Sequence, residues 1–148
     1  MARGSPDHTD RTELQYMHYT DRVLYEPLVA RPVLPAWDTI LNADIEGVFG
    51  RIRIGSTDPR LYLRIQIDGV YVFNLNADNI FTLGDYGVNA GFSKYVCTRY
   101  DAISDHYDFI YDEEWGLWIK NNITIQLGFA FGGAGNGSFH LFYKEKEL

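Results

Sequence analysis

The stretch 61–76 constrains the fold of this chain more than any other. Two alternating runs, 61–67 and 70–76, flank the dipeptide Asp68-Gly69. An Asp-Gly pair between alternating runs is typical of a two-residue β-hairpin turn, because both turn positions take positive φ, which Gly favours and Asp tolerates. The sequence therefore predicts an antiparallel hairpin inside an all-β domain.

The two faces of this hairpin differ in character. A tight turn predicts the pairs Ile67–Val70, Ile65–Val72 and Leu63–Asn74. Since successive side chains of a strand point to opposite faces, one face carries six apolar residues that are predicted to face the core: Leu61, Leu63, Ile65, Ile67, Val70 and Val72. The other face is mixed and comprises Tyr62, Arg64, Gln66, Tyr71, Phe73 and Leu75. We expect a partner to cover this mixed face, with Arg64 over the ring of Phe73. Coverage by the protein's own second sheet is the alternative.

Composition narrows the choice of partner. The chain has 148 residues, a net charge of −7 and a pI near 4.9. Because binding to nucleic acid requires clustered Lys and Arg, an acidic chain without a basic run argues against it. The sequence contains no run of about 18 apolar residues, so no membrane span is expected. Residues 1–8 show no signal-peptide pattern. The single Cys97 cannot form an intramolecular disulfide.

Residues 1–35 are predicted to form an extended N-terminal arm, separate from a domain of residues 36–148. The first 20 residues are polar, and Pro27, Pro32 and Pro35 exclude a helix and disfavour a central strand. The apolar side chains of this segment must nevertheless lie against something. Its predicted contact residues are Leu28, Val29, Val33 and Leu34. Two alternatives stay open: the segment crosses its own domain, or it clamps a neighbouring subunit.

The rest of the chain reads as short strands between turns. Strands are expected at 37–42, 45–54, 94–100, 106–111, within 117–131 and at 138–146, with the last pairing back onto 117–131. Residues 112–116 are expected to form a turn, and 77–83 fits one helical turn after Asn76. This pattern predicts a jelly-roll-like antiparallel β-sandwich, with a small β-barrel as the alternative.

Three features suggest chemistry, but none has a complete pattern. The glycine run 132–137 precedes an alternating segment rather than a helix, so we expect a hairpin loop and not a phosphate site. The acidic cluster 101–112 contains His106 but lacks a full ligand pattern, so no metal or cofactor is expected. Cys97 lies in an alternating run and is expected to be a packed residue rather than a nucleophile. We expect no enzymatic activity.

The aromatic residues are the remaining functional signal. Trp115 and Trp118 lie close together and near Tyr111. If these rings are exposed on the surface of a β-sandwich, they are suited to stacking on sugar rings. The alternative is that they pack in the core or in a protein interface.

The arm 27–35, the hairpin 67–73 and the segment 115–124 together resemble the small β-sandwich proteins of tailed-phage virions, of the capsid decoration (cement) type. The resemblance implies a non-enzymatic virion protein assembled in the host cytoplasm. It also implies self-association, as a trimer, and contact with a major capsid protein through the arm and the aromatic face. A carbohydrate- or receptor-binding module is the alternative function.

Overall fold

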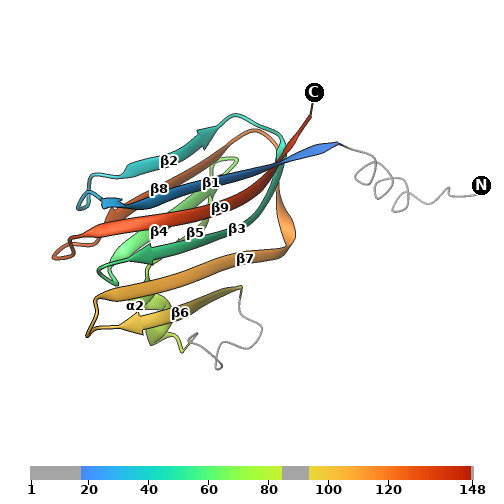
Figure 1. Cartoon of the computed structure of the whole chain (residues 1–148). Helices are drawn as coiled ribbons and strands as arrows, with labels where there is room; N and C mark the ends of the chain where they lie inside the picture. The colour runs from blue at the N-terminus through green and yellow to red at the C-terminus, as the bar shows by residue number, and fades with distance from the viewer. Residues whose placement is uncertain (1–17, 85–93, 148) are drawn as a thin grey trace, which may run out of the picture.

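The chain folds into two antiparallel sheets packed face to face (Figure 1). The computed structural model describes residues 18–84 and 94–147. Its five-stranded sheet has the order β1 (Tyr19–Ala30), β9 (Asn136–Lys146), β3 (Gly47–Ser56), β7 (His106–Ile119) and β6 (Tyr95–Asp101). The four-stranded sheet has the order β2 (Asp38–Ala43), β8 (Ile123–Phe129), β4 (Leu61–Ile67) and β5 (Val70–Leu75). The predicted all-β sandwich is confirmed.

The strand order is that of a jelly roll. Strand β1 pairs with β9, β2 with β8, β3 with β7, and β4 with β5. The chain thus behaves like one long hairpin whose two arms are wrapped together into two sheets. Strand β6 is an addition that pairs only with β7 at the edge of the larger sheet.

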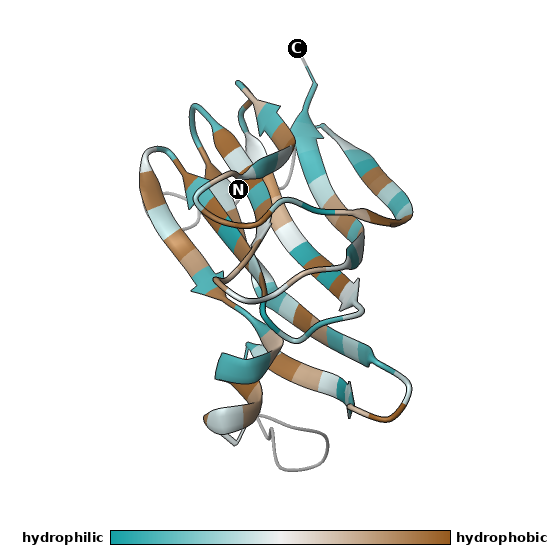
Figure 2. Cartoon of the chain, turned by 90° about the vertical axis from the view of Figure 1, so that its left-hand side faces the viewer, coloured by the Kyte–Doolittle hydropathy of each residue, from teal (hydrophilic) through white to brown (hydrophobic). Residues whose placement is uncertain are grey.

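Alternation along the strands builds the core between the sheets. Figure 2 shows apolar and polar residues alternating along most strands. Alternate side chains of β8 and β9 are buried: Ile123, Ile125, Leu127, Phe139, Leu141 and Tyr143. At roughly 25 cal/mol per Å² of apolar surface, this burial is the main favourable contribution to folding.

The β4–β5 hairpin forms at the predicted turn, but its register changes after two pairs. Asp68 and Gly69 have φ of 51° and 83°, as expected for this turn. Ile67 pairs with Val70 and Gln66 with Tyr71, and then a bulge leaves Val72 without a partner. Ile65 therefore pairs with Phe73 rather than with Val72.

The bulge turns Phe73 inward, so its predicted place on an interface was wrong. A shift of one residue exchanges the two faces of a strand. Phe73 is 5% exposed, and its ring stacks on that of Tyr111 at 4.5 Å between centroids. Leu75 likewise pairs with Leu63 and packs against the core. The alternative, coverage by the protein's own second sheet, is confirmed for these two side chains.

The predicted arm boundary at residue 35 was also wrong. Residues 19–30 form strand β1, which pairs with β9 along its length. Pro27 is tolerated because β1 is an edge strand and its register shifts between Glu26 and Val29. Residues 1–17 lie outside the described part of the chain. For residues 19–35, the alternative that the segment crosses its own domain is confirmed.

Arg31 fixes the connection between β1 and β2. Its guanidinium is buried, forms ion pairs with Glu26 and Asp38, and donates to the Gly137 carbonyl oxygen at 3.2 Å. The chain then runs along β8, where Val33 bridges to Phe129. These contacts tie the segment to both sheets.

Three further segments can be compared with the conformations expected from the sequence. The glycine-containing loop before β9 is not a hairpin turn, because β8 and β9 belong to different sheets and β9 pairs with β1 and β3. Residues 112–116 do not form a turn but a bulged part of β7. A short helix does form after Asn76, as α2 (Ala77–Thr82), and its N-cap is the Asn76 side chain.

Candidate ligand-binding groove

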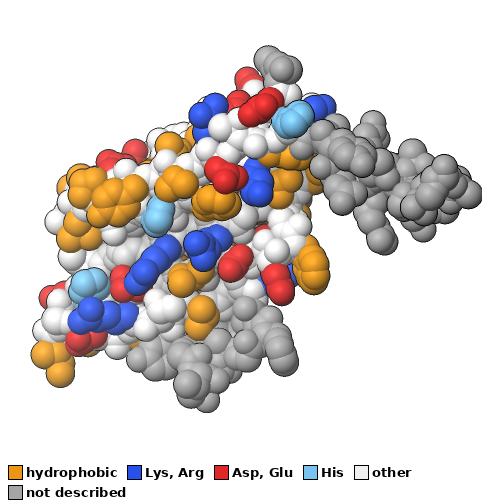
Figure 3. Space-filling model, turned by 45° about the vertical axis from the view of Figure 1, so that its right-hand side comes forward, with side chains coloured by type: hydrophobic (Ala, Val, Ile, Leu, Met, Phe, Trp, Pro, Cys, Tyr) orange, Lys and Arg blue, Asp and Glu red, His pale blue; other side chains and the backbone are white. Residues whose placement is uncertain are grey.

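The outer face of the five-stranded sheet presents three rows of side chains. The register of β3 with β9 and β7 sets these rows side by side. The rows are Lys144, Val48, Trp118; then Phe142, Arg51, Asp112; then His140, Arg53, Ile110. Figure 3 shows cationic and apolar side chains gathered together on this side of the molecule.

A wide bulge in β7 interrupts this regular pattern. Arg51 pairs with Asp112 and Phe49 with Leu117, so residues 113–116 stand opposite Gly50 alone. Gly116 has φ of 77°, a conformation that glycine adopts without strain. The bulge holds Trp115 outward, where its side chain is 92% exposed.

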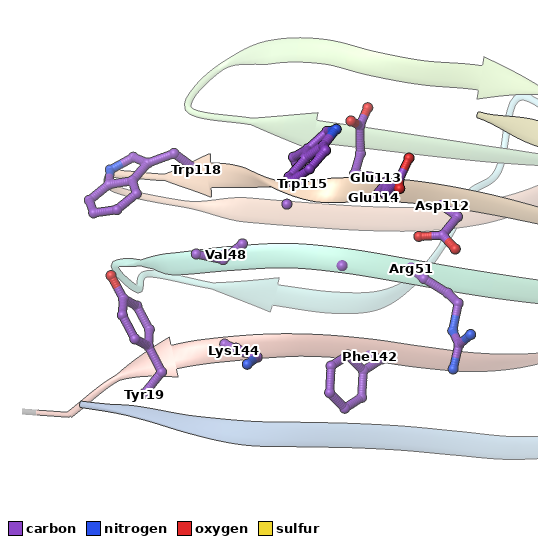
Figure 4. Close-up of a pocket in the computed structure, with 12 residues that line it drawn as sticks. Tyr19, Val48, Arg51, Asp112, Glu113, Glu114, Trp115, Trp118, Phe142 and Lys144 are labelled. Atoms are coloured by element: carbon purple, nitrogen blue, oxygen red, sulfur yellow. The ribbon is translucent and has the colours of Figure 1, made fainter. Parts of the chain in front are cut away.

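A groove of about 590 Å³ lies between this bulge and β9 (Figure 4). Its aromatic wall comes from three strands: Trp115 and Trp118 from β7, Phe142 from β9 and Tyr19 from β1. Gly50 lies in the floor, where a Cβ atom would come within 3.2 Å of the Phe142 ring. The missing side chain therefore keeps the floor of the groove open.

Charged groups line the same groove. Its carboxylates are Asp112, Glu113 and Glu114, and its cations are Arg51 and Lys144. Glu113 is already engaged, since it accepts from the Tyr111 hydroxyl at 2.6 Å and pairs with Lys94 at 3.3 Å. Within the described residues, Arg51, Asp112 and Glu114 form no ion pair with one another or with other side chains. Their polar groups are free to meet a ligand.

Two of the three aromatic residues predicted to bind a ligand line this groove. Trp115 is exposed and Trp118 is half-buried, and both contribute to its wall. The prediction for Tyr111 was wrong: it is buried against Phe49 and Phe73, and this desolvation raises the pKa of its hydroxyl.

Sequence reasoning missed the other side of the groove. Phe142 and Lys144 are outward positions of β9, which its alternation reveals once Leu141 and Tyr143 are assigned to the core. No local signal places these residues beside β7, because the neighbourhood is created by β3 pairing with both strands.

The predicted interface residues of the hairpin lie on the other sheet. Arg64 does cover an aromatic ring, but the ring is that of Trp37, at 3.9 Å from the centroid, instead of Phe73. Arg64 also donates to the Gln126 side chain at 2.6 Å. Tyr62 and Arg64 are therefore half-buried by their own chain, and Tyr71 beside them is exposed.

The predicted contact residues of the arm lie along the edge of the sandwich. Leu28 and Val33 are exposed, whereas Val29 and Leu34 are half-buried. Leu34 packs over Gly128 of β8. Half of this set is thus already used within the domain.

The remaining sequence candidates have structural roles. Asp101 accepts hydrogen bonds from the hydroxyl and backbone of Ser104 and the backbone of Ile103, which lowers its pKa to about 2. Within the described ranges, no three His, Cys, Asp or Glu side chains gather closely enough to hold a metal ion. Cys97 is confirmed as a packed residue; burial raises the pKa of its thiol to about 11.

Sequence comparison adds no assignment. No protein-family model matches the chain, and no curated protein shows significant similarity to it. Among the helices that the structure describes, none is long and apolar enough to cross a membrane.

Proposed function

We propose that this protein is a non-enzymatic carbohydrate-binding module whose site is the groove beside the β7 bulge. The observation that carries the proposal is Trp115, a 92% exposed indole held outward by a bulge next to a groove of about 590 Å³. A large apolar side chain exposed beside a concave surface is typical of a binding site.

The lining suits a saccharide. The C–H faces of a pyranose ring pack against aromatic planes, and Trp115, Trp118 and Phe142 offer such planes on opposite sides of the groove. Sugar hydroxyls need donors and acceptors, which Arg51, Asp112 and Glu114 supply at the same surface. The bulge and the sheet register fix the backbone positions from which these side chains project, which limits the entropic cost of binding.

The test is binding to a broad glycan array, followed by calorimetry with the saccharides that bind. Trp115→Ala should weaken binding at least about tenfold, since removing a central aromatic contact typically costs more than about 1 kcal/mol. Phe131→Ala is the matched control, because Phe131 is 93% exposed and lies outside the groove. Bound saccharides should be recovered uncleaved.

Three results would count against the proposal. Unchanged saccharide binding by Trp115→Ala would show that the binding site is not this groove. Absence of binding to any saccharide would refute a carbohydrate ligand. Recovery of cleaved saccharide would show an enzyme, with Asp112 and Glu114 as the first residues to substitute.

A virion structural protein remains the second candidate, and one observation favours it. Exposed apolar side chains follow the free edge formed by β1 and the segment after it: Val23, Tyr25, Leu28 and Val33. Such a strip is suited to contact with a neighbouring subunit in a trimer or with a major capsid protein. Many such contacts, each weak by itself, would together give a stable lattice.

Light scattering after size exclusion tests this candidate, together with a pull-down by virion proteins. The Leu28→Ser variant should dissociate a trimer without lowering the melting temperature of the monomer. A wild-type chain that stays monomeric at all concentrations and binds no virion protein would exclude it.

A further inference from the structure

A second hollow continues the groove along the same face. It measures about 460 Å³ and is lined by Val23, Arg51, Arg53, Ile110, His140 and Phe142. Arg51 and Phe142 line both hollows, so the two form one path across β9, β3 and β7. Lys144 and His140 lie four residues apart on β9, about 13 Å at the usual rise of a strand. That length exceeds a single sugar ring.

The two hollows differ in charge. The first contains three carboxylates beside Arg51 and Lys144, whereas the second has only cationic or neutral side chains in its lining. Asp112 is the cross-strand partner of Arg51 on β7, and Oδ2 of Asp108 lies 4.0 Å from Nη2 of Arg53. Arg53 remains 59% exposed despite that contact. The guanidinium groups thus keep donors facing the hollow.

This cationic spot stands on a chain of net charge −7. Arg51 and Arg53 are two residues apart on one face of β3, so an anion lying between them would be attracted to both guanidinium groups. A guanidinium binds a carboxylate through two parallel hydrogen bonds, which a neutral hydroxyl does not reproduce. His140, opposite Arg53 on β9, adds a further hydrogen-bonding ring to the hollow.

We infer that the groove selects a saccharide chain that carries a carboxylate: Trp115 and Trp118 stack on one sugar ring, and Arg51 and Arg53 bind the carboxylate of a neighbouring sugar. The inference rests on the proposed carbohydrate-binding function. It adds that the ligand is negatively charged and that its carboxylate lies in the second hollow. Val23, Ile110 and Phe142 supply the apolar floor for the ring that carries the carboxylate.

The experiment uses the full chain on an array where each acidic saccharide is printed beside its carboxyl methyl ester. Sialylated, glucuronate-containing and galacturonate oligosaccharides are included, with sulfated chains as a further class. The free acids should bind at least about tenfold more tightly than their esters, in line with the contribution of a hydrogen bond to a charged group. The preference should weaken as salt is raised.

Substitutions separate the two halves of the groove. Arg53→Gln should weaken binding of the acid more than binding of the ester and so reduce the preference for the acid, whereas Trp115→Ala should weaken binding of both. Arg99→Gln is the matched control, because Arg99 is 48% exposed, pairs with Asp101 at 3.6 Å and lies outside both hollows.

The outcomes distinguish this inference from the proposed function. Equal binding of acids and esters, or a preference for sulfated chains, would overturn the inference that the groove selects a carboxylate. The proposal of a carbohydrate-binding groove would still stand. An acid preference as large in Arg53→Gln as in the wild-type chain would also overturn the inference. Failure to bind any saccharide would overturn both.

Discussion

At the scale of single residues, Phe73 shows how strongly one position depends on its register. Its ring lies within 6.2 Å, centroid to centroid, of the rings of Tyr95, Phe109 and Tyr111. These contacts join β5 of one sheet to β6 and β7 of the other. Phe73 is therefore a link between the two layers.

Phe73→Ala should lower the free energy of unfolding by about 3–5 kcal/mol, because it removes a buried ring and leaves a cavity. Urea unfolding monitored by circular dichroism measures this loss. Tyr71→Ala is the control, since Tyr71 is 53% exposed on the opposite face of the same strand and should change stability little. Similar stability of the two variants would contradict the inward position of Phe73.

Two aspartates close loops by accepting backbone hydrogen bonds. Asp68, in the β4–β5 turn, accepts from the backbone N–H groups of residues 120–122, so the hairpin turn also fixes the turn between β7 and β8. Asp101 does the same for the β6–β7 loop. These hydrogen bonds lower the pKa of both carboxyl groups.

The lowered pKa values predict a loss of stability in acid. The Asp101 carboxylate has a pKa of about 2 in the folded chain, against about 3.9 when unfolded. Its stabilising contribution is therefore complete above about pH 4 and is lost as pH falls through about 2. Asp101→Asn should be less stable than wild type at pH 7, and urea midpoints should converge near pH 2. A constant difference across that range would contradict this role.

At the scale of elements, the bulge in β7 shapes one wall of the groove and exposes Trp115. Regular pairing would place an ordinary alternating strand beside β3, with no residue standing clear of the sheet. The extra residues, 113–116, instead place Trp115 above the groove while Leu117 returns to the core. Gly116 makes this path possible, since a Cβ atom there would overlap Cγ1 of Val48.

Gly116→Ala should lower stability and also weaken saccharide binding. Positive φ alone costs an alanine about 1–2 kcal/mol, and the overlap with Val48 adds to that. Gly69→Ala is the matched control, because Gly69 has φ of 83° but nothing within 4 Å of a new Cβ atom. Gly69→Ala should lose only the stability that positive φ costs an alanine, and its saccharide binding should be unchanged. Calorimetry and urea unfolding of both variants decide whether the bulge geometry matters for the site.

At the scale of the whole molecule, the sandwich is closed by its two most distant strands. Strand β1 pairs with β9, from Tyr19 with Lys146 to Ala30 with Asn136. Arg31 then joins this sheet to the start of β2 through Gly137 and Asp38. The N-terminal strand is thus part of the fold, and it also supplies Tyr19 to the groove.

Deletion of residues 1–35 should accordingly prevent cooperative folding or lower the melting temperature by more than about 10 °C. The deletion exposes one edge of β9 and removes the buried Arg31, which together should cost several kcal/mol. Thermal melts by circular dichroism measure the effect. Tyr25→Ser, which changes an exposed side chain and keeps the strand, is the control. A deletion variant that melts like the full chain would show that β1 is dispensable.

The sequence by itself determined the class of fold and part of the site. Period-two alternation and turn residues predicted the sandwich, and Asp68-Gly69 located its central turn, because both signals are local properties of the chain. The Trp115–Trp118 pair indicates a possible ligand contact for a similar reason, because two large rings lie close together in the sequence and near Tyr111.

Tertiary structure decided which face each ring occupies and what surrounds it. The bulge opposite Gln66 reversed the alternation of β5, and the bulge opposite Gly50 turned Trp115 outward; no local pattern marked either bulge. Strand β1 forms by pairing with β9 more than a hundred residues away, and its prolines hide this strand from any local pattern. The groove combines side chains from β1, β3, β7 and β9, and only the order of the strands in the sheet makes them neighbours.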